Sequence, residues 1–577
     1  MQPTAPDPKQ DMSPIKKYAP LALVVVAVIA VLGWNLASGS DDNDGSKPSD
    51  VKISKGPDSL ADAQLMPNTM TFAKAKRDGK EGTIDWGKRC DTSTGKLALP
   101  LLPPPDCFAP FTGDNGGATA NGVTKDSIKV VLYLAQANDP VLKFIYDQIG
   151  NNDTTDQQFE TSKGFVTMFN QYYETYGRKV ELVRYDATGN SSDPVAAVAD
   201  AESIAKDVQP FAVIGGPILT NAFADTLAKN KVLCIACTPG QPNSWYVDRA
   251  PYVWDVQKAA EQNQQLAAEY IGKRLAGNVA KNAGDAAMHN TKRVFGYVHV
   301  SASDNDPVLE KSFTKRLADD YGVEFAVIQT YASPLDLAGS GRDLITKLKD
   351  AGVTSVVFNG DPLAPQSLTR IASEQDWHPE WVITGSALVD TAAFSRTYDQ
   401  AQWAHAFGPS NLFARIPPTQ PGGAGYLYRW YFDATAPADQ TVPVVAAPHQ
   451  VIFSAIQGMG PAVTYENFRK VLFSAPIVKS TTISPQVSYG DRGFFPATDY
   501  AGLDDQTEIW WDPEPTGVDE LGRDGAGLWR YVDGGKRYLP GEWPTGEPKV
   551  FDKAGTVTVM NGPPAEATLP TYEPLPR

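Results

Sequence analysis

The stretch KVELVRYDATGNSSDPVAAVADAESIAKDVQPFAVIGG, residues 179–216, decides the fold class of this 577-residue chain. Its first and last segments, KVELVRYDA and PFAVIGG, are rich in β-branched and apolar residues and have the length of strands. Between them, Asp193 can cap a helix and Pro194 suits the first helical position. The apolar residues expected on one face of that helix are Val195, Val198, Ile204 and Val208. A strand, a helix and a strand joined by short loops predict a parallel βαβ unit.

The same alternation continues on both sides of this unit. SIKVVLYLAQ (127–136) and KVLCIACT (231–238) are predicted strands, and the segment between 160 and 177 shows helical spacing at Phe165, Met168, Phe169, Tyr172 and Tyr173. After residue 290 the pattern repeats, with predicted strands RVFGYVHVS, EFAVIQTYA, SVVFNGD and EWVITGSA. Two similar α/β halves predict two lobes with a cleft between them. The last hundred residues alternate aromatic residues with Gly and Asp turns, which is typical of short antiparallel strands.

Composition and charge exclude several functions. The chain is 42% hydrophobic and 20% charged, as globular proteins are, and its formal charge of -16 opposes binding to nucleic acid or anionic lipid. The sequence contains no Gly-x-Ser-x-Gly, P-loop or Gly-x-Gly-x-x-Gly after a strand, and its histidines lack ligand spacing. We therefore expect no enzyme activity, no cofactor and no metal site.

An apolar run from Tyr18 to about Ala37 follows two lysines and precedes an acidic, Gly/Ser-rich segment. At about 20 residues it is long enough to cross a bilayer, with the main domain outside. A cleaved signal peptide is the alternative, because Ala37-Ser38-Gly39 resembles a cleavage site. Both interpretations export the protein. A lipid-modified N-terminal cysteine is excluded, since no cysteine precedes Cys90.

The four cysteines are expected to meet an oxidising compartment. A disulfide between Cys90 and Cys107 would close a Pro-rich loop and stabilise it by about 3 kcal/mol. Cys234 and Cys237 lie about 10 Å apart in an extended strand, so two buried, unpaired thiols are the favoured interpretation. A local disulfide requires a sharp turn of the chain at Thr238-Pro239-Gly240, and a redox or metal pair is the third alternative.

Several stretches together resemble the type I periplasmic binding fold, specifically the solute-binding proteins of branched-chain amino acid ABC importers. They are YGRKVELVRYDATGNSSDPVAAVADAESIAKDVQPFAVIGG, TNAFADTLAKNKVLCIACTPG, APYVWDVQKAAEQNQQLAAEYI, LITKLKDAGVTSVVFNGD and WVITGSALVD. The resemblance covers roughly Asp126 to Tyr500. It implies two Rossmann-like lobes joined by three crossovers, near Val256, near residues 407–413 and near Val478.

These observations divide the chain into seven parts. They are a cytoplasmic N-terminus (1–17), a transmembrane anchor or signal (18–38), an extracellular linker or stalk with a stapled loop (39–125), the first part of lobe 1 (126–256), lobe 2 (257–410), a return segment of lobe 1 (411–478), and C-terminal strands on lobe 2 with an extended tail (479–577).

Ligands of open α/β sheets bind beyond the carboxyl ends of the strands. The residues expected there are Gln136, Asn138, Pro217, Thr220, Asn221, Thr238, Ser301, Asp304 and Asp361. The resemblance implies that the loops of Thr220 and Thr238 hold a ligand carboxylate and that Asp361 receives an ammonium group. Ordinary caps and turns are the alternative for each residue. The segments PILTN, SASDND and ACTPGQ depart from the family pattern, which leaves the ligand open.

The predicted function is that of a membrane-tethered, extracellular solute-binding protein that delivers a small solute to the permease subunits of an ABC importer, in a Gram-positive-type, actinobacterial-like envelope. The alternative is a cell-envelope interaction protein that keeps the fold without a transport ligand. Trp510, Trp511, Trp529 and Trp543 are expected to cover a sheet or pin a hairpin, with a carbohydrate-stacking platform as the other possibility.

Overall fold

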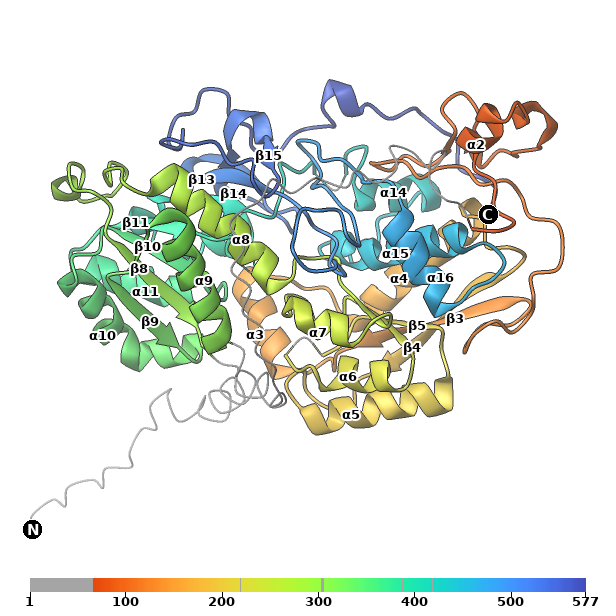
Figure 1. Cartoon of the computed structure of the whole chain (residues 1–577), viewed down its shortest axis with the longest axis horizontal. Coiled ribbons are helices and arrows are strands. Elements are labelled where there is room, and N and C mark those ends of the chain that lie inside the picture. The colour runs from red at the N-terminus through yellow and green to blue at the C-terminus, as the bar shows by residue number, and fades with distance from the viewer. Residues whose placement is uncertain (1–65, 218, 302–305, 387, 418) are drawn as a thin grey trace, which may run out of the picture.

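The computed structural model describes residues 66–577, except residues 218, 302–305, 387 and 418 (Figure 1). Its first large sheet has five strands, all parallel, in the order β4-β3-β5-β6-β7. Their bounds are β3 Ser127–Leu134, β4 Lys179–Asp186, β5 Ala212–Ile214, β6 Leu233–Ile235 and β7 Val253–Trp254. The parallel βαβ unit predicted around residues 179–216 is therefore confirmed.

The second large sheet has eight strands in the order β14-β13-β12-β11-β10-β8-β9, with β15 paired to β13. Strands β9, β8, β10, β11 and β12 are parallel to one another. Strands β13, β14 and β15 extend the sheet with antiparallel pairings. Their bounds are β8 Phe295–Val300, β9 Val327–Tyr331, β10 Ser355–Asn359, β11 Glu380–Ile383, β12 Ala406–Ser410, β13 Gln506–Val518, β14 Asp524–Tyr531 and β15 Arg537–Tyr538. We call the units built on the first and second sheets lobe 1 and lobe 2.

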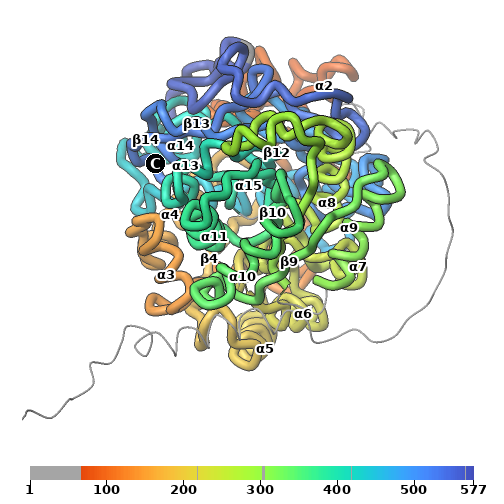
Figure 2. Tube along the Cα trace, turned by 90° about the vertical axis from the view of Figure 1, so that its left-hand side faces the viewer, coloured from red at the N-terminus to blue at the C-terminus, as the bar shows by residue number. Residues whose placement is uncertain are grey.

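Helices cover both faces of each sheet. In lobe 2, α8 and α9 lie on one face and α10 and α11 on the other, which Figure 2 shows as three layers. The helices of lobe 2 are α8 Ala260–Tyr270, α9 Asp306–Tyr321, α10 Leu337–Asp350, α11 Ala364–Glu374, α12 Ala392–Ser395 and α13 Gln400–Trp403. Those of lobe 1 are α4 Thr155–Tyr172, α5 Pro194–Ser203, α6 Ala222–Lys229, α7 Asn243–Asp248, α14 Ala424–Phe432, α15 Val442–Met459 and α16 Tyr465–Ser474.

Between β7 and β13, the described chain passes between the lobes three times. It leaves β7 for α8, leaves β12 for α14, and leaves α16 for β13. The first and third crossings run side by side, because the backbone N–H of Asp255 donates to the carbonyl of Tyr500 at 2.9 Å and that of Gly502 donates to the carbonyl of Asp255 at 3.1 Å. We call this region the hinge.

The helix after β4 differs from its sequence prediction in one respect. Asp193 caps α5 and accepts from the backbone N–H groups of Val195 and Ala196, as expected. Val195, however, is 77% exposed, and the buried residues of the helix are Ala197, Asp200 and Ala201. A π-helical turn follows at Ile204–Val208. At about 100° per residue an α-helix already places Val195 on the face opposite the fully buried Ile204, so the predicted single apolar face is wrong at Val195. In α4, by contrast, all five predicted core residues are buried.

The predicted stalk is wrong for its described part. Residues 66–125 form α2 (Phe72–Arg77) and the strands β1 (Cys90–Asp91) and β2 (Lys96–Leu97), and Leu97 and Leu99 are buried in the core of lobe 1. Arg89 forms an ion pair with Glu174 of lobe 1 at 2.6 Å. The predicted anchor or signal at 18–38 lies outside the described residues. No helix within the described part is long and apolar enough to span a membrane.

Both pairs of cysteines form disulfides. The Cys90–Cys107 bond is confirmed. The favoured interpretation of Cys234 and Cys237 as unpaired thiols is wrong, because they are bonded with their Cα atoms 5.9 Å apart. The strand β6 ends at Ile235, and Ala236 turns the chain with a φ of 55°. The sharp turn thus lies between the two cysteines, at Ala236, rather than after them at Thr238-Pro239-Gly240.

The tryptophans of the C-terminal region are packing residues. Trp510, Trp511 and Trp529 lie on the antiparallel strands of lobe 2, and Trp543 packs against Tyr538 and Tyr270. All four are at most 4% exposed, so the prediction that they cover the sheet is confirmed and a stacking platform is excluded.

Candidate binding cleft between the lobes

The carboxyl ends of the parallel strands of both sheets meet at the hinge. The first crossing leaves the carboxyl end of β7 and enters α8. In the first turn of α8, Asn263 donates from Nδ2 to the carbonyl of Thr384 at 3.0 Å, and Thr384 directly follows β11. Because ligands of open α/β sheets bind at these edges, the region beside the hinge is the candidate site.

Three carboxamide side chains line the lobe 2 side of this junction, and we call Asn263, Asn411 and Gln506 the carboxamide cluster. Nε2 of Gln506 lies 2.8 Å from Oδ1 of Asn263 and 3.2 Å from Oδ1 of Asn411. Nδ2 of Asn411 donates to Oδ1 of Asn263 at 3.1 Å and to the carbonyl of Gly385 at 2.9 Å. Gly385 has a φ of 74°, which favours glycine, and an added Cβ there would lie 2.9 Å from Nε2 of Gln506.

Buried charges connect the cluster to the hinge. Lys258, in the first crossing, donates to Oδ1 of Asn411 at 2.9 Å and to the carbonyl of Asp505 at 2.6 Å. Its side chain therefore joins all three crossings. Burial lowers the pKa of Lys258 to about 7. Arg537 pairs with the carboxylate of Asp505 at 2.9 Å and fixes the third crossing to lobe 2.

The lobe 1 side of the junction contains Asn221 and Gln241. Nδ2 of Asn221 donates to Oε1 of Gln241 at 2.9 Å. The carbonyl of Gln241 accepts from the N–H of Ala260, one helical turn before Asn263. The lobe 1 amides and the carboxamide cluster thus lie at the same end of α8.

The other sequence-predicted residues of lobe 1 have mainly structural roles. Thr220 is fully buried, and its Oγ1 accepts from the N–H of Ala222 at 3.2 Å. Thr238 is buried below it, with Oγ1 3.5 Å from the carbonyl of Thr220. Pro217 is buried, Gln136 is half-buried, and Asn138 is exposed in the turn before the next helix.

In lobe 2, Asp361 is occupied by protein partners. It accepts from the hydroxyl of Tyr331 at 2.6 Å and from the N–H groups of Leu363 and Ala364 at 2.8 and 3.0 Å. Burial raises its pKa. The alternative of an ordinary cap therefore describes Asp361 better than an ammonium receptor. Ser301 is half-buried at the end of β8, and Asp304 lies outside the described residues.

The carboxamide cluster was missed by the sequence analysis. Asn263, Asn411 and Gln506 are far apart in the chain, and none follows a strand that the sequence pattern predicted; Asn411 follows β12, which the pattern did not identify. The only sequence signal was that Asn411 falls within the crossing predicted at residues 407–413 and that Asn263 lies close to the one predicted near Val256, whereas Gln506 lies far from the one predicted near Val478. Asn221 is the one predicted residue that the structure brings beside this junction with an unpaired polar atom.

An additional helix, α3 (Pro140–Ile149), bridges the lobes on one flank. It follows β3 of lobe 1, yet Ile149 is buried in the core of lobe 2 with Ile145 packed beside it. Its N-terminus is capped by Asp139, which also accepts from Ser191 at 2.6 Å. The helix contacts α12, placing one helix from each carboxyl edge in contact.

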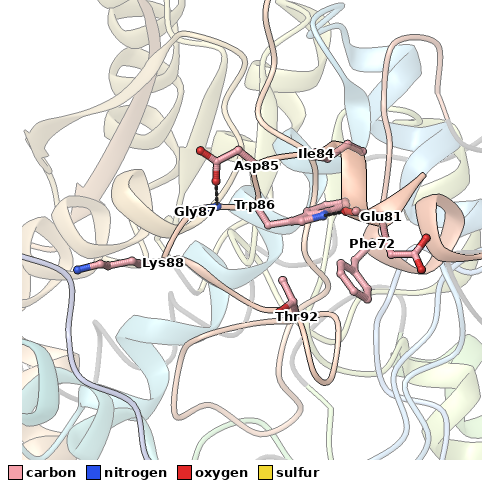
Figure 3. Close-up of a pocket in the computed structure, with 9 residues that line it drawn as sticks. Phe72, Glu81, Ile84, Asp85, Trp86, Gly87, Lys88 and Thr92 are labelled. Atoms are coloured by element: carbon pink, nitrogen blue, oxygen red, sulfur yellow. Dashed lines mark hydrogen bonds between the residues drawn. The ribbon is translucent and has the colours of Figure 1, made fainter. Parts of the chain in front are cut away.

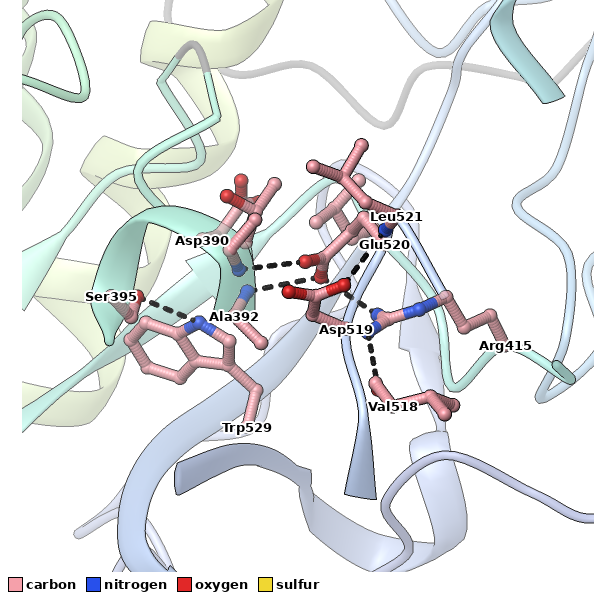
Figure 4. A network of polar contacts seen from close by, with 12 residues as sticks. Asp390, Ala392, Ser395, Arg415, Val518, Asp519, Glu520, Leu521 and Trp529 are labelled. Carbon is pink, nitrogen blue, oxygen red and sulfur yellow. Dashed lines mark hydrogen bonds and ion pairs between the residues drawn. The ribbon is translucent and has the colours of Figure 1, made fainter. Parts of the chain in front are cut away.

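The N-terminus of α12 is held by the tip of the β13–β14 hairpin (Figure 4). The carboxylate of Glu520 accepts from the N–H groups of Ala392 and Ala393 at 3.0 and 2.9 Å and pairs with Arg415 at 2.8 Å. Nearby, the buried carboxylate of Asp390 accepts from Ser410, and burial raises its pKa to about 6. These acids therefore serve the internal structure of lobe 2.

An open pocket of about 650 Å³ lies elsewhere, on the N-terminal segment (Figure 3). Phe72, Ile84 and Trp86 supply its apolar side, and Glu81, Asp85 and Lys88 its polar side. Phe72 and Trp86 also pack edge to face at 5.0 Å within the core of lobe 1. This pocket is not part of the junction between the sheets.

No family model and no curated protein matches this sequence. Several solved structures are similar in fold. A fatty acid ABC transporter substrate-binding protein from Thermomonospora curvata is 15% identical, with 72% of this chain and 95% of that chain covered and a TM-score of 0.46. A solute-binding protein of an ABC transporter from R. palustris, in complex with 4-hydroxybenzoate, is 13% identical, with 72% and 99% covered and a TM-score of 0.47.

A branched-chain amino acid transporter substrate-binding protein from Streptococcus pneumoniae, in complex with isoleucine, is also similar. It is 13% identical, with 70% of this chain and 99% of that chain covered and a TM-score of 0.45. At these scores the similarity is distant and concerns the fold alone.

Proposed function

We propose that this chain is an extracytoplasmic solute-binding protein, whose two lobes enclose a small solute and present it to the permease subunits of an ABC-type importer. The observation that carries the proposal is the junction of two parallel carboxyl edges at a hinge of three crossings, lined by polar side chains from both lobes. Such an arrangement suits capture between two bodies that rotate about a hinge.

The proposed location rests on two features of the chain. Both disulfides fit an oxidising compartment outside the cytoplasm. The apolar run at 18–38 would then anchor the protein in the membrane, or direct its export if it is cleaved. We propose no catalytic role, and two acids that follow strands of lobe 2, Asp361 and Asp390, are engaged with protein donors.

A second candidate is a cell-envelope interaction protein that keeps this fold without a transport ligand. The bridging helix α3 favours it, because Ile149 of a lobe 1 segment is buried in the core of lobe 2. Such a contact opposes separation of the lobes, which a capture cycle requires.

Thermal unfolding of the full-length chain in the presence of small solutes distinguishes the two. A solute bound only by the folded state, at a hundredfold excess over its Kd, should add about 2.7 kcal/mol to the unfolding free energy. A clear rise in Tm with at least one amino acid, amide, sugar or carboxylate supports the solute-binding protein. No rise across all four classes would favour the interaction protein.

A further inference from the structure

We propose that the cleft selects an uncharged solute that donates hydrogen bonds through hydroxyl or amide N–H groups, received by Gln506, Asn221 and Ser386. This inference rests on the proposed function, since it names the chemistry of the solute that the two lobes would hold.

The orientations of the carboxamide cluster are fixed by backbone carbonyls, which only accept hydrogen bonds. Asn263 places its Nδ2 3.0 Å from the carbonyl of Thr384, and Asn411 places its Nδ2 2.9 Å from that of Gly385. Their Oδ1 atoms must then be acceptors. Gln506 lies 2.8 and 3.2 Å from these two oxygens and has to offer them its Nε2 group.

This arrangement leaves Oε1 of Gln506 as an acceptor without a donor, although the residue is fully buried. Two other buried oxygens at the same carboxyl edges are unpaired, namely Oδ1 of Asn221 in lobe 1 and Oγ of Ser386 in lobe 2. A buried acceptor without a donor costs about 1–3 kcal/mol. These three unpaired acceptors therefore carry a penalty that a donor-bearing solute would remove as the lobes close around it.

The charges at the junction argue against an anionic solute. In the described segments that form it, Lys258 and Arg537 are the cations, and both are committed to protein acceptors, Asn411 and Asp505. A carboxylate bound there would lack a free cation. Asp361, the acid implied for an ammonium group, already accepts three hydrogen bonds. A solute with neutral hydroxyl or amide N–H donors matches the unpaired acceptors of Gln506, Asn221 and Ser386.

Titration calorimetry and thermal unfolding of the full-length chain with three sets of probes test this inference. The first set is D-glucose and myo-inositol, the second is acetamide and nicotinamide, and the third is the charged set of L-isoleucine, L-glutamate and benzoate. Binding of a probe from the first or second set, with no binding in the third, supports the inference. Binding in the first set identifies a polyol, and binding in the second set identifies an amide. Binding only in the third set overturns it while the proposed function stands. Binding in none overturns both.

Two variants locate the site for whichever uncharged probe binds. Gln506→Met removes the fully buried acceptor, and Asn221→Leu removes the acceptor of lobe 1, so each should weaken binding at least about tenfold. Gln402→Met is the matched control. Gln402 is also fully buried and hydrogen-bonded, but to Trp377, Ser373 and Trp381, at the opposite edge of the lobe 2 sheet. Unchanged affinity in Asn221→Leu and in a folded Gln506→Met would overturn the assignment.

Discussion

Asp504 illustrates how burial controls a charge next to the hinge. Its Oδ2 accepts from Nε2 of Gln486 at 3.0 Å and from Oγ of Ser488 at 2.8 Å, while its buried Oδ1 has no donor. Burial raises the pKa of Asp504 to about 7. The carboxyl group is therefore protonated in the folded chain over a range where it ionises in the unfolded chain.

We predict that Asp504→Asn stabilises the protein at pH 8 and has little effect at pH 4. The folded-state pKa is raised, so the stability that the protonated group contributes is present below pH 3.8 and is lost as the pH rises through about 7. Asparagine retains an acceptor for Gln486 and Ser488 without the charge. Urea unfolding of both proteins from pH 4 to pH 8 measures the difference. A variant less stable at pH 8 than the parent would contradict the argument.

The two disulfides should differ in their effect on stability. Cys90 and Cys107 are separated by 17 positions and Cys234 and Cys237 by 3. In the chain-entropy model, the first bond contributes about 3 kcal/mol and the second about 2 kcal/mol. We predict that replacing Cys90 and Cys107 by alanine lowers the unfolding free energy more than replacing Cys234 and Cys237 by alanine. Denaturant unfolding of the two double variants measures it, and a larger loss for the Cys234–Cys237 pair would contradict the loop-length explanation.

The residues predicted from sequence were those at the ends of recognisable strands. Asn221 and Thr220 were found in this way, because a strand followed by a helix marks a carboxyl edge. Gln506 could not be found, since its position depends on an antiparallel strand that returns to lobe 2 after a long excursion through lobe 1. The bond between Cys234 and Cys237 was missed because strand geometry was assumed beyond Ile235.

At the scale of elements, the hairpin β13–β14 does more than extend the sheet of lobe 2. Its tip supplies Glu520, which caps α12, the helix that contacts the bridging helix α3 (Figure 4). A helix N-terminus leaves backbone N–H groups without helical partners, and a carboxylate there satisfies them. The hairpin thus connects the antiparallel strands of lobe 2 to α12 and, through it, to the bridging helix α3.

We predict that Glu520→Ala lowers the unfolding free energy by about 1–2 kcal/mol, the usual effect of losing an N-terminal cap. The N–H groups of Ala392 and Ala393 lose their acceptor, and Arg415 loses its partner. Glu514→Ala on strand β13 of the same hairpin is the control, because that side chain is exposed and pairs with Lys553. Chemical denaturation of both variants measures the effect. Equal, small losses would show that the cap is not needed.

Element prediction succeeded where periodicity reflected burial and failed where another segment changed the packing. The apolar spacing of α4 identified its core residues because the helix packs against the lobe 1 sheet along its length. Residues 66–125 lacked periodicity, yet Leu97 and Leu99 are buried, since short extended segments fill the core without a regular pattern. Similarly, nothing in the sequence of α3 indicated that Ile149 would pack in the other lobe.

At the scale of the molecule, two lobes with three crossings are what the repeated strand–helix pattern and the resemblance predicted. The chain adds connections between the lobes that neither the pattern nor the resemblance implied. One is α3 on the flank of the cleft, and another is the C-terminal tail. Val557 in the tail pairs with Tyr531 of lobe 2, whereas Leu575 donates from its N–H to the hydroxyl of Tyr172 in lobe 1 at 2.9 Å.

The tail reaches lobe 1 at the edge opposite the candidate cleft. Tyr172 ends α4, which runs back from the carboxyl edge of the sheet to the start of β4. Near the same end, the carbonyl of Tyr572 accepts from Nε1 of Trp430 at 2.7 Å, and its hydroxyl donates to Asp91 at 3.0 Å. The C-terminus accordingly lies beside α14 (Figures 1 and 2).

We therefore predict that removing residues 569–577 destabilises the protein by about 1–3 kcal/mol without changing its affinity for a solute. The truncation removes the hydrogen bonds of Tyr572 and Leu575, each worth about 1 kcal/mol, and exposes Trp430 and Tyr172. Removing Arg577 alone is the control, because it loses only the stacking of its guanidinium on Phe432. Thermal unfolding measures the first effect and calorimetric titration the second. Lost affinity in a truncated chain that remains folded would mean that the tail, by holding lobe 1 against lobe 2, sets the geometry of the cleft from its far side.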